Sequence, residues 1–135
     1  MNVPKAETGE RGKNRGQMIY LVDDEPMLLE LASVILEPLG YTVKTFTSPD
    51  AALCAFEAAE SKPDLLITDY AMHNMNGLEL AAACRHIQPN LKVLLVTGTV
   101  GPDVCDGAAV QPDGFLAKPY EPKQLSDATA AILAG

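Results

Sequence analysis

The sequence contains no tryptophan, only three cysteines and few basic residues. The cysteines, Cys54, Cys84 and Cys105, are odd in number and scattered, which predicts neither a disulfide framework nor a cysteine metal site and favours a reducing, cytoplasmic location. Ten Lys and Arg residues against eighteen Asp and Glu residues give a net charge of -8, which repels a phosphate backbone. We therefore expect no direct binding to nucleic acid.

Long apolar runs are also absent, because no run approaches the roughly 20 residues that span a bilayer, and no membrane segment is expected. Residues 1–17 are polar and lack the apolar centre of a secretory signal, which predicts a disordered leader. The chain has 135 residues, and about 100 to 150 residues are enough for one hydrophobic core. Residues 18–135 are therefore predicted to form a single domain.

Short apolar runs are present, and each is predicted to be a strand. Most of them are nearly continuous, which is typical of strands buried on both faces of a parallel sheet, whereas the second alternates and is expected at an edge. Segments with helical periodicity separate the runs, so the predicted fold is α/β with a doubly wound five-stranded parallel sheet. The runs are residues 19–22, 41–46, 65–67, 93–96 and 115–117.

The predicted helices have recognisable ends. Pro26 is expected to open the first helix, and Ser48 or Asp50 to cap the second. Asn76 is expected to cap the third, and the last follows Glu121. The core stripe of the first helix is predicted to be Leu28, Leu31, Ala32, Ile35 and Leu39.

The segment 99–114 breaks this regularity. It should contain a fourth helix between the last two strands, but it includes three glycines and two prolines, which are poor residues in a helix interior. At most a short helical turn is predicted, near residues 103–109.

Polar residues stand at the ends of four of the predicted strands. Asp23 and Asp24 follow the first strand, Asp69 the third, Thr97 the fourth and Lys118 the fifth. Taken singly, each has an ordinary explanation as a helix cap, a turn residue or a solvated lysine. Because the carboxyl ends of parallel strands meet at one edge of a sheet, we expect all of these side chains to lie near one another.

Three carboxylates in one place repel one another unless a cation neutralises them. Mg²⁺ prefers oxygen ligands and is commonly held by a few carboxylates and a phosphate, whereas His73 and His86 show no ligand spacing. With such a metal, one carboxylate can attack a phosphoryl group, and an ammonium and a hydroxyl can stabilise the phosphoryl oxygens. The sequence therefore predicts a magnesium-dependent phosphoryl site at this edge.

In these residues the chain resembles the response-regulator receiver domains of bacterial two-component signalling, from about Met18 to Leu133. The resemblance implies a flavodoxin-like receiver fold with strand order 2-1-3-4-5, here with a shortened or irregular fourth helix. It rests on the segments Leu-Val-Asp-Asp-Glu at 21–25, Leu-Ile-Thr-Asp-Tyr-Ala-Met at 66–72, Met-Asn-Gly at 75–77, Leu-Val-Thr-Gly at 95–98 and Phe-Leu-Ala-Lys-Pro at 115–119.

The resemblance implies that Asp69 is the phosphoacceptor. It implies that Mg²⁺ binds to Asp23, Asp24, Asp69 and the backbone carbonyl of Ala71. The phosphoryl donor would be a phosphohistidine of a histidine kinase or phosphotransfer protein, and the output would be protein contacts in the cytoplasm. Such a phosphoprotein is not an enzyme beyond its own phosphorylation and slow autodephosphorylation.

The resemblance also assigns Thr97 and Lys118 to the phosphoryl oxygens, and Thr97 with Phe115 to a conformational switch. A cis peptide bond is common after the matching lysine. Ala71 and Thr99 match positions that influence the access of water to the acyl phosphate, and neither offers a carboxylate or amide to orient that water. We therefore expect slow autodephosphorylation.

Two further features concern the loop after Asp69 and the first helix. His73 stands where the family most often has proline, so the loop after Asp69 is expected to be less rigid. The first helix also has apolar residues outside its predicted core stripe, which are either covered by neighbouring elements or form a docking site for the phosphodonor. These residues are Met27, Leu29, Val34 and Leu36.

Other functions remain open. A magnesium-dependent phosphatase with an aspartyl nucleophile normally has an Asp-x-Asp pair, which Asp69-Tyr70-Ala71 does not match. A flavin-binding module would have Gly, Ser and Thr where the loop after the first strand has acids. A degenerate receiver that only scaffolds a complex is disfavoured by the full set of acids and lysine. We expect a single-domain receiver or one excised from a larger regulator, and dimer formation stays open.

Overall fold

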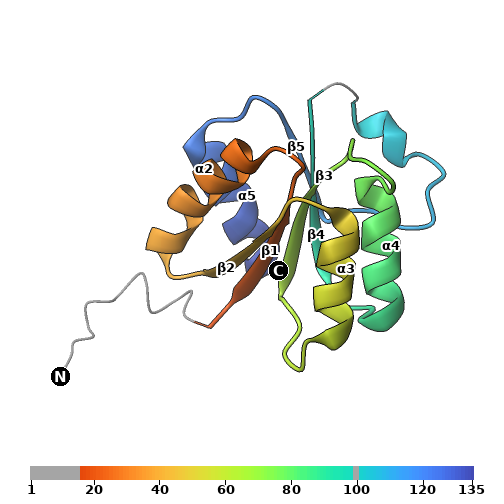
Figure 1. The fold of residues 1–135 in the computed structure, drawn as a ribbon. Helices are drawn as coiled ribbons and strands as arrows, with labels where there is room; N and C mark the ends of the chain where they lie inside the picture. The colour runs from red at the N-terminus through yellow and green to blue at the C-terminus, as the bar shows by residue number, and fades with distance from the viewer. Residues whose placement is uncertain (1–15, 99–100) are drawn as a thin grey trace.

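The computed structural model describes residues 16–98 and 101–135. Its strands form one parallel five-stranded sheet in the order β2-β1-β3-β4-β5 (Figure 1), so the predicted fold class and strand order are confirmed. The strands are β1 (Met18–Val22), β2 (Thr42–Phe46), β3 (Leu65–Asp69), β4 (Lys92–Thr97) and β5 (Gly114–Ala117). Residues 1–15 of the predicted leader lie outside the described residues, as does Thr99.

The α-helices lie on both faces of the sheet (Figure 1), with α2 and α5 on one face and α3 and α4 on the other. No helix in the described ranges is long and apolar enough to cross a membrane. The helices are α2 (Pro26–Leu36), which the 3-10 turn η2 (Glu37–Leu39) extends, α3 (Pro49–Ala58), α4 (Gly77–Ile87) and α5 (Pro122–Ala134).

Each face of the sheet has its own hydrophobic core, because successive strand side chains point to opposite faces. In β1, Ile19 belongs to the core that includes residues of α2 and α5, and Tyr20 belongs to the core that includes residues of α3 and α4. Every residue of β3 is buried. β2 is the partly exposed edge strand that its alternating sequence predicts. The sheet is thus a rigid support for the residues at its carboxyl edge.

The predicted caps of two helices are confirmed. The Ser48 hydroxyl accepts hydrogen bonds from the backbone amides of Asp50 and the next residue at the start of α3. Asn76 and Glu79 form a capping box at the start of α4, which fixes where this helix begins after the loop that follows β3.

The predicted core stripe of α2 is confirmed only in part, since Ala32 is buried and Ile35 and Leu39 pack against the core. Leu29 and Leu36 are 6% and 0% exposed, whereas Leu31, a member of the predicted stripe, is 49% exposed. The helix has apolar residues on most of its circumference, so a periodicity of 3.6 residues does not select one face. The strongly exposed apolar side chains of α2 are Met27, Leu31 and Val34.

The crossover between β4 and β5 contains no α-helix in its described part, residues 101–113, which agrees with the predicted irregular segment. It contains the short 3-10 turn η3 (Pro102–Cys105). Arg85 of α4 anchors the end of the crossover that precedes β5. It donates hydrogen bonds to the Gln111 carbonyl oxygen and the Asp113 carboxylate, at 2.7 and 2.8 Å. The Asp113 carboxylate also accepts a hydrogen bond from the Val93 amide of β4. Side-chain anchoring therefore replaces helical packing in this segment.

Candidate functional site

The carboxyl edge of the sheet brings three carboxylates together. Asp69 ends β3, and Asp23 and Asp24 directly follow β1. One carboxylate oxygen from each of the three residues lies within 4.8 Å of those of the other two. Asp23 and Asp69 are each only 8% exposed, and Asp24 is open to solvent. The predicted acidic cluster is therefore formed by two buried acids and one exposed acid.

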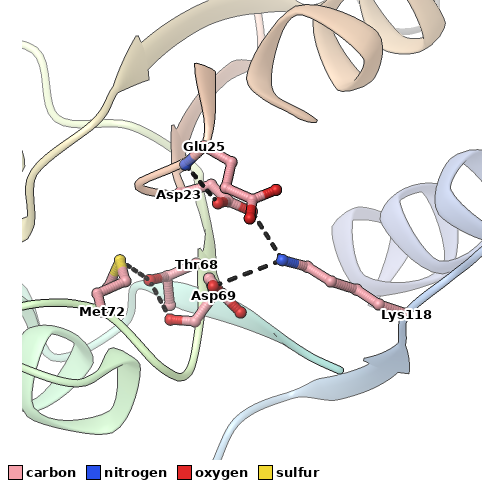
Figure 2. Close-up of polar contacts among 6 residues, drawn as sticks. All are labelled: Asp23, Glu25, Thr68, Asp69, Met72 and Lys118. Carbon is pink, nitrogen blue, oxygen red and sulfur yellow. Dashed lines mark hydrogen bonds and ion pairs between the residues drawn. The ribbon is translucent and has the colours of Figure 1, made fainter. Parts of the chain in front are cut away.

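Lys118 reaches into this cluster from the end of β5 (Figure 2). Its Nζ lies 3.0 Å from Asp23 Oδ2 and 3.4 Å from Asp69 Oδ2. The other oxygen of Asp23 accepts a hydrogen bond from the Glu25 amide at 2.9 Å, at the turn before α2. The Asp23 carboxylate is thus held by a backbone amide on one side and an ammonium group on the other.

Burial and charge shift the pKa of two of these groups. Desolvation raises the pKa of Asp69, the Lys118 ammonium lowers it and the Asp23 carboxylate raises it again, so the pKa of Asp69 lies above its ordinary value. Desolvation opposes the charged form of Lys118, but the hydrogen bond and charge of Asp23, followed by those of Asp69, outweigh it. The pKa of Lys118 therefore also lies above its ordinary value, and its ammonium stays charged at neutral pH.

The remaining predicted residues lie around this cluster. Thr97 ends β4, is 2% exposed, and its carbonyl oxygen accepts a hydrogen bond from the Lys118 amide at 2.8 Å. Phe115 in β5 is partly buried, and Ala71 is exposed in the loop after β3. The peptide bond between Lys118 and the following proline is cis, as the resemblance implied. Thr99 cannot be compared, because it lies outside the described residues.

The loop between Asp69 and α4 is anchored at both ends and near its tip. The Tyr70 amide donates to a carbonyl oxygen of β4, and the Tyr70 carbonyl oxygen accepts a hydrogen bond from the Gly77 amide at 2.9 Å. Asn74 has a φ of 75°, and its side-chain amide donates to the Asp50 carboxylate of α3 at 3.2 Å. No sequence pattern predicts this link to α3.

Sequence reasoning also missed Tyr120, which lines two cavities beside the acidic cluster. The inner cavity, of about 20 Å³, also touches Asp23 and Asp69 and is otherwise apolar. The outer one is an open, mainly apolar groove of about 370 Å³. Its other lining residues are Leu28, Leu31, Gly98, Lys118 and Pro119. The only sequence signal for Tyr120 is its position directly after the Lys118-Pro119 pair.

The donor set of this edge fits a hard divalent cation. When the three acids are ionised, their negative charges exceed the single positive charge of Lys118 by two (3 − 1 = 2). A divalent cation would balance this net charge. All the offered ligand atoms are oxygens, which Mg²⁺ prefers, and the exposed Asp24 leaves the cluster open to solvent. The fit thus rests on charge and ligand type together.

The strand order and the polar carboxyl edge define a flavodoxin-like α/β domain with an acidic cluster that could hold a metal ion. Residues 19–130 match the family model described as the response regulator receiver domain. The chain therefore belongs to the family of response regulator receiver domains, as its sequence motifs predicted.

Bacterial regulators are among its relatives. The chain is 31% identical over 109 residues to the DNA-binding response regulator MtrA of Mycolicibacterium smegmatis, with 81% of this chain and 47% of that protein covered. It is 34% identical over 112 residues to the transcriptional regulatory protein GlrR of Escherichia coli strain K12, with 82% and 24% covered. The chain thus spans about half or less of the length of these relatives.

Solved structures of isolated receivers match over nearly their whole length. A receiver domain protein from Clostridium thermocellum has a TM-score of 0.77 and 26% identity, with 87% of this chain and 94% of that chain covered. The chemotaxis protein CheY4 of Vibrio cholerae has a TM-score of 0.75 and 25% identity, with 86% and 98% covered. The chain is therefore similar in fold to these proteins over nearly the whole length of their solved chains.

Proposed function

We propose that this receiver domain accepts a phosphoryl group on Asp69, from a phosphohistidine of a histidine kinase or phosphotransfer protein, in a magnesium-dependent reaction. The observation that carries the proposal is the cluster of Asp23, Asp24 and Asp69 within 4.8 Å, with Lys118 bridging two of the three acids. A cluster that only stabilised the fold would have no need of buried carboxylates in excess of their cationic partner.

In the proposed reaction an Asp69 carboxylate oxygen forms a new P–O bond while the P–N bond of the phosphohistidine breaks. The donor imidazole takes the electron pair of that bond, and the product is an acyl phosphate on Asp69. Lys118 and the hydroxyl of Thr97 would stabilise the charge on the equatorial phosphoryl oxygens. The raised pKa of Lys118 supports this role, because it keeps the ammonium charged throughout the physiological pH range.

Asp23, Asp24 and Asp69 would hold the Mg²⁺, with the carbonyl oxygen of Ala71 as a further ligand. When bound, the ion would neutralise the charge of the incoming phosphoryl oxygens. The carboxylates supply the negative charge that attracts the ion. Without it, their mutual repulsion opposes the approach of a phosphoryl group.

The phosphodonor is proposed to dock along α2. Met27, Leu31 and Val34 are 79%, 49% and 63% exposed, and their spacing of four and three residues places them along one side of the helix. Leu31 also lines the apolar groove beside Lys118. Replacing Leu31 with Glu should slow phosphotransfer from a protein donor and leave phosphorylation by acetyl phosphate unchanged. A buried residue such as Leu29 is unsuitable for this test, because its substitution would disturb the core.

The output is proposed to be a change in protein contacts in the cytoplasm, with Thr97 and Phe115 as the switch. These residues lie on β4 and β5, which are joined by the crossover whose described part, residues 101–113, contains no α-helix. We therefore propose that the crossover, anchored through Arg85, takes the place of a signalling helix. Ala71 and Thr99 offer no carboxylate or amide to orient a hydrolytic water, so autodephosphorylation should be slow. A phosphoryl half-life of seconds in the purified protein would contradict that proposal.

The direct test is incubation with Mg²⁺ and acetyl phosphate, followed by intact mass measurement. We expect the mass of one phosphoryl group to be added to the wild-type chain and none to the Asp69→Asn variant, with no addition to either after chelation of the metal. No gain in mass, or an equal gain in Asp69→Asn, would overturn the proposed function.

A further inference from the structure

Tyr120 is the aromatic residue nearest in sequence to the phosphoryl-binding lysine, from which it is separated only by Pro119. It packs against the core between the sheet and helices α2 and α5. It lines both the outer groove, which also includes Lys118, and the inner cavity, which includes Asp23 and Asp69. Tyr120 is therefore part of the lining that the groove of Lys118 and the cavity of the two buried acids share.

The position of the Lys118 ammonium depends on its flexible stem. A lysine side chain has many accessible rotamers, so its head stays in one place only when its methylene groups are packed. The stem passes Gly98, where an added Cβ atom would lie 3.5 Å from Lys118 Cβ and 3.6 Å from Lys118 Cδ. Lys118 and Tyr120 line the same groove, which Leu28 and Leu31 of α2 also line.

The inner cavity gives the Tyr120 ring a second role. Its volume of about 20 Å³ is enough for roughly one water molecule. Removing the ring would join this cavity to the open groove, so water could reach Asp23 and Asp69 from the α2 side. Hydration there would weaken the ion pairs of Lys118 with both acids, because their attraction depends on a low local dielectric.

The phenol also lies within electrostatic range of the cluster. Burial raises the pKa of Tyr120, the Lys118 ammonium lowers it, and the Asp23 carboxylate raises it, with the pKa above its ordinary value overall. The same two residues form the 3.0 Å ion pair. Tyr120 thus shares a cavity with two acids of the cluster and lies within range of its charges.

We propose that Tyr120 is a positioning residue for phosphorylation, whose ring holds the Lys118 stem in place and keeps water out of the buried side of the cluster. This inference rests on the proposed function of Asp69. It assigns the role to the ring and not to the hydroxyl, because no hydrogen bond of the Tyr120 hydroxyl is found among the described residues.

The test is a double-mutant cycle of Tyr120→Ala with Lys118→Ala, with the rate of acetyl phosphate-dependent phosphorylation as the readout. Tyr120→Ala should slow the wild-type reaction roughly tenfold, since misplacing a reacting group by about 1 Å can cost up to a hundredfold. In the Lys118→Ala background, the same change should alter the residual rate by less than about twofold. Tyr120→Phe should react like the wild type, and Tyr120→Leu should lie in between.

Tyr41→Leu is the matched control for lost aromatic packing. Tyr41 belongs to the same core and is 5% exposed, but it precedes β2 and so lies at the opposite edge of the sheet. The Tyr41→Leu change should lower the melting temperature and leave the phosphorylation rate unchanged.

Each outcome decides a different point. A wild-type rate in Tyr120→Ala, or an equal loss in both backgrounds of the cycle, would overturn the positioning role. If Tyr120→Ala does not fold, Tyr120→Leu takes its place in the same double-mutant cycle. A wild-type chain that takes no phosphoryl group would overturn the proposed function itself, before Tyr120 is tested.

Discussion

Lys118 lies closer to Asp23 than to Asp69, with its Nζ at 3.0 Å from one carboxylate and 3.4 Å from the other. The shorter pair thus joins the lysine to an acid that is proposed to bind the metal, and not to the proposed phosphoacceptor. An ammonium and a divalent cation in one small cluster repel each other and compete for the same oxygens. Metal binding should therefore shift Lys118 away from Asp23 and free it for the phosphoryl group.

Removing the charge of Lys118 should therefore strengthen the binding of Mg²⁺. We expect Lys118→Met, which keeps most of the stem, to bind Mg²⁺ about three- to tenfold more tightly, or about 0.7 to 1.4 kcal/mol. Calorimetric titration of both proteins with Mg²⁺ would measure the difference. The variant should also lose most of its phosphorylation by acetyl phosphate. Equal or weaker metal binding by Lys118→Met would show that the ammonium does not compete with the ion.

The raised pKa of Asp69 predicts how stability depends on pH without metal. The folded state binds this proton more tightly than the unfolded state, whose pKa stays near 3.8. The stabilisation is therefore complete below that value and is lost as the pH rises through the folded-state pKa. At neutral pH Asp69→Asn should melt at a higher temperature than the wild type, and the difference should close towards pH 3.8.

Thermal melts across this pH range, with chelator present, would measure the effect. Saturating Mg²⁺ is the internal control, because it should stabilise the wild type more than Asp69→Asn. A wild-type chain that melts above the variant at neutral pH without metal would mean that Lys118 outweighs the desolvation of Asp69.

Gly77, the first residue of α4, allows this helix to approach β3 closely. A Cβ atom there would lie 2.4 Å from the Asp69 carbonyl oxygen and 2.9 Å from Leu95 Cδ1. We expect Gly77→Ala to lower the free energy of unfolding by about 1 to 3 kcal/mol through overpacking. Helix propensity alone predicts the opposite sign. Gly98→Ala is the control, since its Cβ would make ordinary contacts, and chemical denaturation should show a change within about 0.5 kcal/mol.

Much of this structure could be predicted because its signals are local. The continuous apolar runs identified the buried strands, and capping residues such as Ser48 and Asn76 located the helix starts. The acidic cluster followed from one rule, that the ends of parallel strands meet at a single edge. Asp23 and Asp69 are 46 residues apart in sequence (69 − 23 = 46), yet that rule alone brings them together.

The features that were missed depend on tertiary packing. Packing against the sheet and α5 determines which face of α2 is buried. Because α2 has apolar residues on most of its circumference, its sequence does not show which face that is. The position of Tyr120 in the lining of two cavities exists only once the segment that follows β5 lies beside α2. The anchoring by Arg85 joins residues 26 and 28 positions away, Gln111 and Asp113, and no short-range pattern encodes such a link.

The hydrogen bond from Asn74 to Asp50 gives a last prediction, about the loop that carries the Ala71 carbonyl. Asn74→Asp would place two carboxylates face to face and break this link at 3.2 Å. Because the loop would then be less well held, Mg²⁺ should bind several-fold more weakly, although the added negative charge alone would strengthen binding. Adding Asp50→Asn to this variant restores the pair, with the amide donor now at position 50 and the carboxylate acceptor at position 74. The double variant has the same net charge as the wild type. Calorimetric Mg²⁺ titration should show recovery in the double variant, and tighter binding in Asn74→Asp alone would mean that charge, and not the link, governs this loop.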